Sequence, residues 1–219
     1  GELDLAENVT AREAQFALRI EPGLVGLEDV RLKMGEGQIA GQLALRRTAE
    51  GAALLAKADL TNIALPQGPV AGRISGHVEL TSTGLSHAEL AAGLTGEGQA
   101  QIEGLTIANA DVAGLARLIA SVDRGQVNVD ERDLRVALLR EVERAPFAGG
   151  KRDFLLNGAG GVLRFQSFDE PRLSLGFDAR QWTQETRVML TSPTRPRDWM
   201  GEAPSATLIW QGRTGAMQR

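Results

Sequence analysis

The residues with the most evident chemistry are Ser75, His77 and Glu79, which alternate along the segment GRISGHVEL. A hydroxyl, an imidazole and a carboxylate are the groups that a hydrolytic triad uses. In a strand, however, residues two apart lie side by side on one face, so these three side chains cannot converge on one substrate atom. We therefore expect a polar strand face here and no catalytic residues.

Metal and cofactor sites are not predicted either. The second histidine, His87, lies ten residues further on, in a segment whose Ser86 and Glu89 have the spacing of a capping box and predict a short helix. The chain has no cysteine, which excludes thiolate zinc sites and disulfides and fits either redox compartment. The GAGG run at 158–161 separates two predicted strands and predicts a turn or bulge, not a phosphate-binding loop.

Composition narrows the class of protein further. The 219 residues are 42% hydrophobic, enough for a sizeable core, and carry a net charge of -4 with 4% aromatic residues. A chain without a basic stripe and with few rings for base stacking is not expected to bind nucleic acid. The sequence has no window of about 18 apolar residues, so no membrane span is predicted. Because the sequence begins at Gly1 without a leader, we expect a fragment or a processed chain.

The elements that carry these residues are predicted to be strands. The segments AQFALRI and VRLKM alternate apolar and other residues with period two, and GQIAGQLAL and GRISGHVEL repeat one pattern 35 residues apart. One face of each repeat is apolar and the other polar, which is typical of a one-sided antiparallel sheet. Gly41 and Gly76 fall on the apolar face, where they predict curvature. The acidic pair Glu28 and Asp29 fits a turn.

Two longer helices are predicted in the middle of the chain. The first covers Ala110–Val122, with Val112, Leu115 and Ile119 on an apolar stripe that must cover either a neighbouring sheet or the end of a groove. The second covers Glu131–Glu143, with Asp130 as its N-cap. Strands follow to the end of the chain.

Three tryptophans gather in that last part, and we expect them to form a local core that closes the end of the sheet, the alternatives being a sugar-binding platform or an interfacial belt. They are Trp182, Trp199 and Trp210.

These patterns predict an α+β fold, mainly antiparallel β, with a curved, groove-like sheet and an inserted group of two to three helices. We expect a single domain over 1–219, taken from a larger protein. It would comprise a β-meander at 1–83, a helical insert with one strand at 84–148, and closing strands at 149–219.

Part of the sequence resembles a known family. The run GPVAGRISGHVELTSTGLSHAELAAGLTGEGQAQIEGLTIANADVAGL is similar to the C-terminal region of AsmA-family proteins, through its S-x-x-E-L helix and the following L-x-G-x-G-x-x-x-I-x-G pattern. The segments GVLRF and PSATLIWQG also resemble that region's closing strands, so the likeness spans roughly 68–212. Glu103 departs from it, because an aspartate or asparagine is expected before Gly104.

The resemblance implies a periplasmic protein, anchored in the inner membrane by a segment outside this sequence. It also implies a role in outer-membrane biogenesis or phospholipid transport, in the company of other envelope proteins. No cofactor is implied. The alternative is a structural scaffold or interaction module of envelope assembly that has no ligand of its own.

An aliphatic concave face would suit a lipid carrier without any catalytic chemistry. Covering one CH₂ group from water is worth about 0.8 kcal/mol, so an acyl chain needs cover worth on the order of 10 kcal/mol. The alternative for each residue is an ordinary core position beneath the helices. The expected lining comprises Ile39, Leu43, Leu45, Ile74, Val78, Leu80, Leu163 and Phe165.

Overall fold

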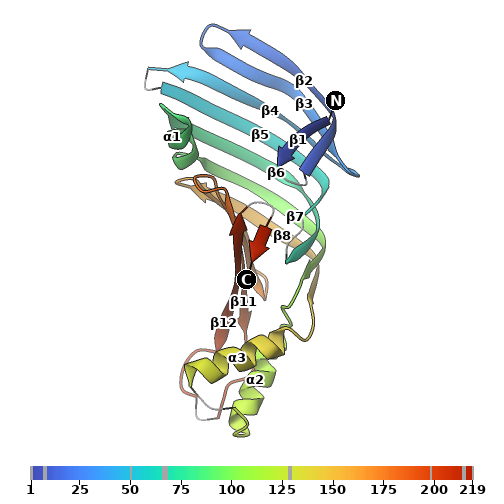
Figure 1. The fold of residues 1–219 in the computed structure, drawn as a ribbon, viewed down its shortest axis with the longest axis vertical. Helices are drawn as coiled ribbons and strands as arrows, with labels where there is room; N and C mark the ends of the chain where they lie inside the picture. The colour runs from blue at the N-terminus through green and yellow to red at the C-terminus, as the bar shows by residue number, and fades with distance from the viewer. Residues whose placement is uncertain are drawn as a thin grey trace.

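The computed structural model describes residues 2–6, 9–49, 51–65, 69–127, 130–197, 199–213 and 216–218. Within these ranges the chain forms one antiparallel sheet of thirteen strands with three helices (Figure 1). Each strand pairs with the next one along the chain, from β1 at one edge to β13 at the other, so the sheet is open. A mainly antiparallel α+β fold is thereby confirmed.

The first eight strands are β1 Glu2–Ala6, β2 Val9–Glu21, β3 Leu24–Met34, β4 Gly37–Thr48, β5 Gly51–Ala64, β6 Val70–Gly84, β7 Thr95–Ile107 and β8 Phe147–Ala159. The last five are β9 Val162–Ser167, β10 Arg172–Asp178, β11 Thr183–Thr191, β12 Ser205–Arg213 and β13 Ala216–Gln218.

Most of these strands are longer than the sequence segments that predicted them. The pair Glu28 and Asp29, expected in a turn, lies inside β3, so that prediction was wrong. The pairing of β3 with β4 shifts between Leu27 and Val30, and Asp29 has a φ of 51°. The acidic pair therefore marks a bulge, which an aspartate tolerates because it enters the left-handed region more readily than most residues.

The three helices are α1 His87–Ala92, α2 Gly114–Asp123 and α3 Glu131–Val142. The predicted caps at Ser86 and Asp130 are confirmed, since their side chains accept hydrogen bonds from the amides of Glu89 and Asp133. In α1 the Glu89 carboxylate reaches Leu85, one residue before the cap.

The start of α2 differs from the prediction by four residues. Instead of beginning at Ala110, the helix begins at Gly114, because the Asp111 carboxylate accepts a hydrogen bond from the Ala113 amide and holds a turn there.

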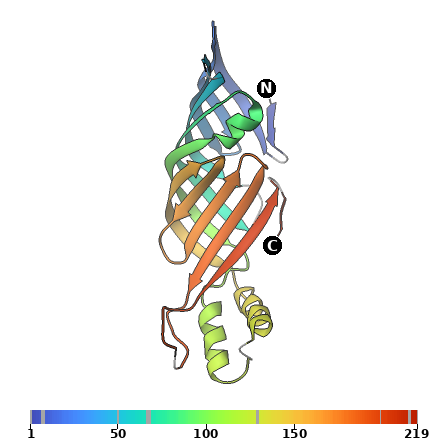
Figure 2. The ribbon, with the colours of Figure 1, turned by 90° about the vertical axis from the view of Figure 1, so that its left-hand side faces the viewer.

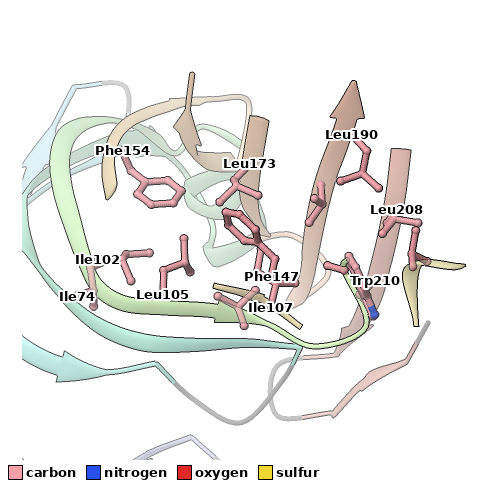
Figure 3. Packing of buried hydrophobic residues seen from close by; sticks show 14 of the residues in the cluster. Ile74, Ile102, Leu105, Ile107, Phe147, Phe154, Leu173, Leu190, Leu208 and Trp210 are labelled. Carbon is pink, nitrogen blue, oxygen red and sulfur yellow. The ribbon is translucent and has the colours of Figure 1, made fainter. Parts of the chain in front are cut away.

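The buried core connects strands that are far apart in the sheet order. Figure 3 shows Ile102 and Leu105 of β7 facing side chains of β8 and of β10–β12, with Leu173 and Leu190 among them. Trp210 belongs to this cluster, whereas Trp182 and Trp199 are 67% and 51% exposed. The expected closing core of three tryptophans is therefore wrong for two of them. Trp182 instead meets Phe177 edge to face, with ring centroids 5.6 Å apart.

Candidate functional site

An apolar face runs across nearly the whole sheet. Residues that pair directly across antiparallel strands share one face, so the register defines continuous rows. One row consists of Leu18, Leu27, Leu43, Ala56, Leu80, Gly96, Gly158, Leu163 and Phe177. A second row consists of Gly41, Ala58, Val78, Gly98, Leu156, Phe165, Leu175, Thr186 and Trp210. We call the side of the sheet that carries these rows the apolar face.

All eight residues predicted to line a groove lie on this face. Leu43, Leu80 and Leu163 belong to the first row, and Val78 and Phe165 to the second. The other three lie on the same face one or two pairs further along their strands, and they are Ile39, Leu45 and Ile74. Each row thus extends the apolar pattern of a single strand across nine neighbouring strands.

Exposure changes along the apolar face. On β2–β4 several of its side chains are open to solvent, with Leu18 at 58% and Leu43 at 38%, whereas Leu27 and Ile39 are half-buried. Val78, Leu80, Leu163 and Phe165 are half-buried. Ile74 is buried in the core cluster next to Ile102, and the partly buried Ile39 and Phe165 pack against that cluster, so these three members of the predicted set belong to the core or its margin.

Glycines form the floor at the middle of the apolar face. Gly96 pairs with Gly158, and a Cβ placed on Gly96 would lie 2.5 Å from Leu80 Cδ2 and 3.3 Å from Leu163 Cδ2. These two leucines come from β6 and β9, and both lean over the same glycine. A Cβ on Gly41 or Gly76 would overlap a backbone carbonyl of the neighbouring strand. Glycine is therefore required at Gly41 and Gly76 by a close approach of backbone, whereas the atom nearest to Gly96 is the end of a leucine side chain, which can move.

Helix α1 covers one end of the apolar face. The Ser82 hydroxyl, next to Leu80 along that face, is buried and donates to the Leu90 carbonyl of α1 at 2.6 Å. Gly161, in the turn between β8 and β9, donates its amide to the Leu94 carbonyl. The opposite end of the same strands meets the buried cluster, so cover is present at both ends.

The opposite side of the sheet, the polar face, carries Ser75, His77 and Glu79. These residues have partners on neighbouring strands that the sequence did not indicate. His77 Nδ1 lies 2.7 Å from Asp59 Oδ1 on β5, and His77 Nε2 lies 3.2 Å from Glu79 Oε1. Glu79 also accepts from Lys57 at 2.7 Å. Ser75 is occupied elsewhere, because its Oγ accepts from the Asn62 amide.

These contacts make an exposed cross-strand ion-pair cluster. The hydrogen bonds to Asp59 and then to Glu79 raise the pKa of His77 above its ordinary value. Lys57 and then His77 lower the pKa of Glu79. Ser75 Oγ and His77 have different partners, and so the arrangement lacks the nucleophile-to-base hydrogen bond that a triad requires.

Arg152 is a second residue that the sequence did not single out. It pairs with Ile102 on the apolar face, is 8% exposed, and donates to the carbonyls of Asp169, Glu170 and Pro171. Burial lowers its pKa. Its guanidinium also stacks 5.0 Å from the Phe147 ring centroid. Arg152 alternates with Phe154 and Leu156, and this pattern could have indicated a buried arginine. A cation at an apolar position of a strand needs hydrogen-bond partners.

A pocket of about 870 Å³ lies between α2, α3 and β12. Figure 2 shows the two helices beyond the lower ends of the strands. Leu115 and Ile119 of the predicted stripe line the pocket and are buried, whereas Val112 lies outside α2 and is 41% exposed. None of the eight residues predicted from the sequence lines this pocket.

Comparison of the chain with models of known families, with curated proteins and with solved structures finds no match. Among the described residues, no group of three or more histidine or acidic side chains is arranged to hold a metal ion. In the same ranges, no helix has the length and apolar character needed to cross a membrane.

Proposed function

We propose that the apolar face contacts the acyl chains of phospholipid or a similar lipid, as a non-catalytic periplasmic module of an AsmA-like envelope protein. In this proposal the protein takes part in outer-membrane biogenesis or phospholipid transport, and a segment outside the described chain holds it at the inner membrane. The observation that carries the proposal is the continuity of the apolar rows from β2 to β12, with an open end at β2–β4.

We further propose that the sheet is curved into a groove on this side. On a flat sheet, strands three apart are separated by about 14 Å. Leu80 and Leu163 stand three strands apart, yet both reach the space above Gly96. The close approaches at Gly41 and Gly76 also favour curvature toward this side, because glycine allows the neighbouring backbone to move toward the apolar face.

The physical reason for binding is removal of apolar surface from water on both partners. An exposed Leu18 or Leu43 gains about 25 cal/mol for each Å² that a lipid chain covers. Large exposed apolar patches mark interaction sites in soluble proteins. Such a face needs no reacting group, which agrees with the ion-pair role of His77 and Glu79 on the opposite side.

A photoreactive residue at Leu43 tests this function directly. We expect crosslinks to lipid when the protein is incubated with vesicles of phosphatidylethanolamine and phosphatidylglycerol, detected by mass spectrometry. A photoreactive residue at Val78 measures how far chains penetrate toward the half-buried middle of the face.

Gln42 provides the matched control, because it neighbours Leu43 but lies exposed on the polar face. A photoreactive residue there should give at most a tenth of the lipid crosslinking. Equal yields from Leu43 and Gln42, or none from Leu43 and Val78, would contradict lipid binding by the apolar face.

A structural scaffold remains the second candidate function. It is favoured by the cover of α1 over Ser82 and by the absence of the eight predicted residues from the lining of the 870 Å³ pocket. In that role the apolar face would pack only against protein. The Leu43 experiment distinguishes the two, since a scaffold gives protein crosslinks without lipid.

A further inference from the structure

Arg47 is a cation at the end of the apolar face. It follows Leu43 and Leu45 along β4 at steps of two residues, so it lies on the same face as these leucines. Across the strands it pairs with Ala52 of β5, and Ala52 pairs with Gly84 of β6. Arg47 is exposed. The apolar face of β4 therefore ends in a guanidinium group whose cross-strand neighbours on β5 and β6 are small.

Cations are rare on this face. In the described part of β4–β8, the other one is Arg152, which is buried and donates to three main-chain carbonyls. The carboxylates of β4–β6 belong to Asp59 and Glu79, and both lie on the polar face with His77. Among the described residues, the Arg47 side chain has no ion-pair or hydrogen-bond partner. Its charge is thus available to an anion.

A guanidinium group beside an apolar surface matches the chemistry of a phospholipid. The acyl chains of such a lipid need apolar cover, and the phosphate next to them is an anion with several acceptor oxygens. Arginine presents its N–H groups as a planar fork that can donate two hydrogen bonds to one phosphate. Arg47 and the leucines that precede it therefore provide complementary contacts for both parts of the same molecule.

The dimensions of β4 agree with one acyl chain. The residues from Leu45 to Ile39 span roughly 20 Å at about 3.3 Å per residue. The acyl chains of one leaflet make up half of a bilayer core of about 30 Å, which is about 15 Å. A chain that lies along this stretch can therefore be covered while its phosphate stays next to Arg47.

The two ends of this stretch offer different environments to a charge. Ile39 packs against the buried cluster, where an anion would lose its water without gaining a partner. Arg47 lies at the opposite end, next to the β4–β5 turn, and helix α1 lies at that same end of the strands (Figure 1). A phospholipid on β4 therefore has one favourable orientation, with its phosphate at the end that carries α1.

We propose that Arg47 binds the phosphate of the phospholipid whose acyl chains contact the apolar face. This inference rests on the proposed lipid-binding function and adds the part of the lipid that the protein recognises. Arg47 is then a specificity-determining residue, because it favours lipids with a phosphate over apolar lipids that have the same chains.

Two lipids with identical acyl chains test the proposal. Protein with a photoreactive residue at Leu43 is incubated with phosphatidylethanolamine or with diacylglycerol, each in micelles of a nonionic detergent, and the crosslinks are measured by mass spectrometry. Phosphatidylethanolamine has no net charge, so general attraction to an anionic surface does not contribute. We expect it to give at least tenfold more crosslinking than diacylglycerol. Equal crosslinking of the two lipids would overturn the proposal.

Arg46 provides the matched control. It is the neighbouring exposed arginine of β4, but it lies on the polar face, where it pairs with Ala53. Arg47→Gln should reduce the preference for phosphatidylethanolamine to within twofold and leave crosslinking of diacylglycerol unchanged. Arg46→Gln should retain the preference, with circular dichroism reporting that both variants are folded. Equal effects of the two substitutions would mean that Arg47 has no specific contact with the phosphate.

Inorganic phosphate distinguishes a lipid headgroup from a free anion. At the concentration of the lipid, it should reduce crosslinking of phosphatidylethanolamine by less than twofold, because it lacks the apolar contacts. Competition as strong as that of unlabelled phosphatidylethanolamine would show a site for free phosphate and overturn the headgroup contact. The two proposals fail in different ways. Without crosslinks to either lipid, lipid binding itself fails, whereas equal crosslinks to both contradict only the role of Arg47.

Discussion

His77 is the residue whose charge depends most directly on its neighbours. Asp59 lies across the β5–β6 pair, Glu79 lies two residues along the same strand, and Gln99 is the neutral neighbour on β7. Lys57 faces Glu79 and offsets part of its charge. Folding therefore favours the imidazolium form of His77, and its pKa is raised.

The sign of the pH effect follows from that direction. A raised folded pKa stabilises the fold below the ordinary value of 6.5, and this contribution is lost as the pH rises through the folded pKa. Because 42% of the His77 side chain is exposed, we expect less than about 1 kcal/mol. Replacement Asp59→Asn should lower the His77 pKa measured by proton NMR titration. An unchanged pKa would contradict the hydrogen bond to Asp59.

Gly41 is a position on the apolar face that has no room for a side chain larger than hydrogen. A Cβ at this position would overlap the Lys57 carbonyl of β5. We expect Gly41→Ala to lower the free energy of unfolding by about 1–3 kcal/mol, measured by urea denaturation, because the neighbouring strand must move.

Gly26 is the control for Gly41, because its added Cβ would have its nearest neighbour, the Leu43 carbonyl oxygen, at 3.6 Å. Gly26→Ala should therefore be neutral or stabilise the fold by up to about 1 kcal/mol, through the unfolded state. Equal losses from both alanines would show that the close approach at Gly41 has no special role.

At the scale of elements, the α2–α3 hairpin depends on one arginine. Arg117 of α2 donates to Asp111 at 2.7 Å and to the Glu141 carboxylate at 2.7 Å, and it also donates to the Glu141 carbonyl at 2.8 Å. Hydrogen bonds to Glu141 and then to Asp111 raise the pKa of Arg117. The 870 Å³ pocket lies between both helices and β12, so this contact positions two of its walls.

Removal of that guanidinium should loosen the hairpin. Arg117→Met leaves the largely buried Asp111 carboxylate without its cation and leaves Glu141 with Arg144 alone, and we expect a loss of about 2–3 kcal/mol in urea denaturation. Amide exchange in α3 should accelerate. The exposed Arg132 of α3 is the control, since Arg132→Met should change stability by less than about 0.5 kcal/mol. Similar losses from both would contradict a specific role for Arg117.

The sequence predicted the helices and strands better than the contacts between them. Period-two alternation identified the strands, and Ser86 and Asp130 marked two helix starts correctly, because these signals act within a few residues. Asp59 beside His77 and Arg117 beside Glu141 could not be foreseen, since strand register and helix packing join positions 18 and 24 residues apart. The pocket between α2, α3 and β12 was missed for the same reason.

At the scale of the molecule, the predicted lining was found on one face because alternation is a property of each strand. The sequence did not indicate how exposure would vary along that face. Leu43 is open while Ile74 is buried, although both are apolar residues of the same alternating pattern. The difference depends on which distant strands and helices lie above each residue, as Figure 3 shows for the cluster near Ile102.

The unbroken order of the strands has a consequence for how the chain reaches its structure. Since every strand pairs with its successor, most pairings close a short loop. The longest connection encloses α2 and α3 between β7 and β8, and those at 85–94 and 192–204 are of intermediate length. Short loops cost little chain entropy, so hairpins can form one after another from any starting point. The sheet resembles a quasi-one-dimensional array in this respect, and its length can change in evolution by whole hairpins without redesign of the remainder.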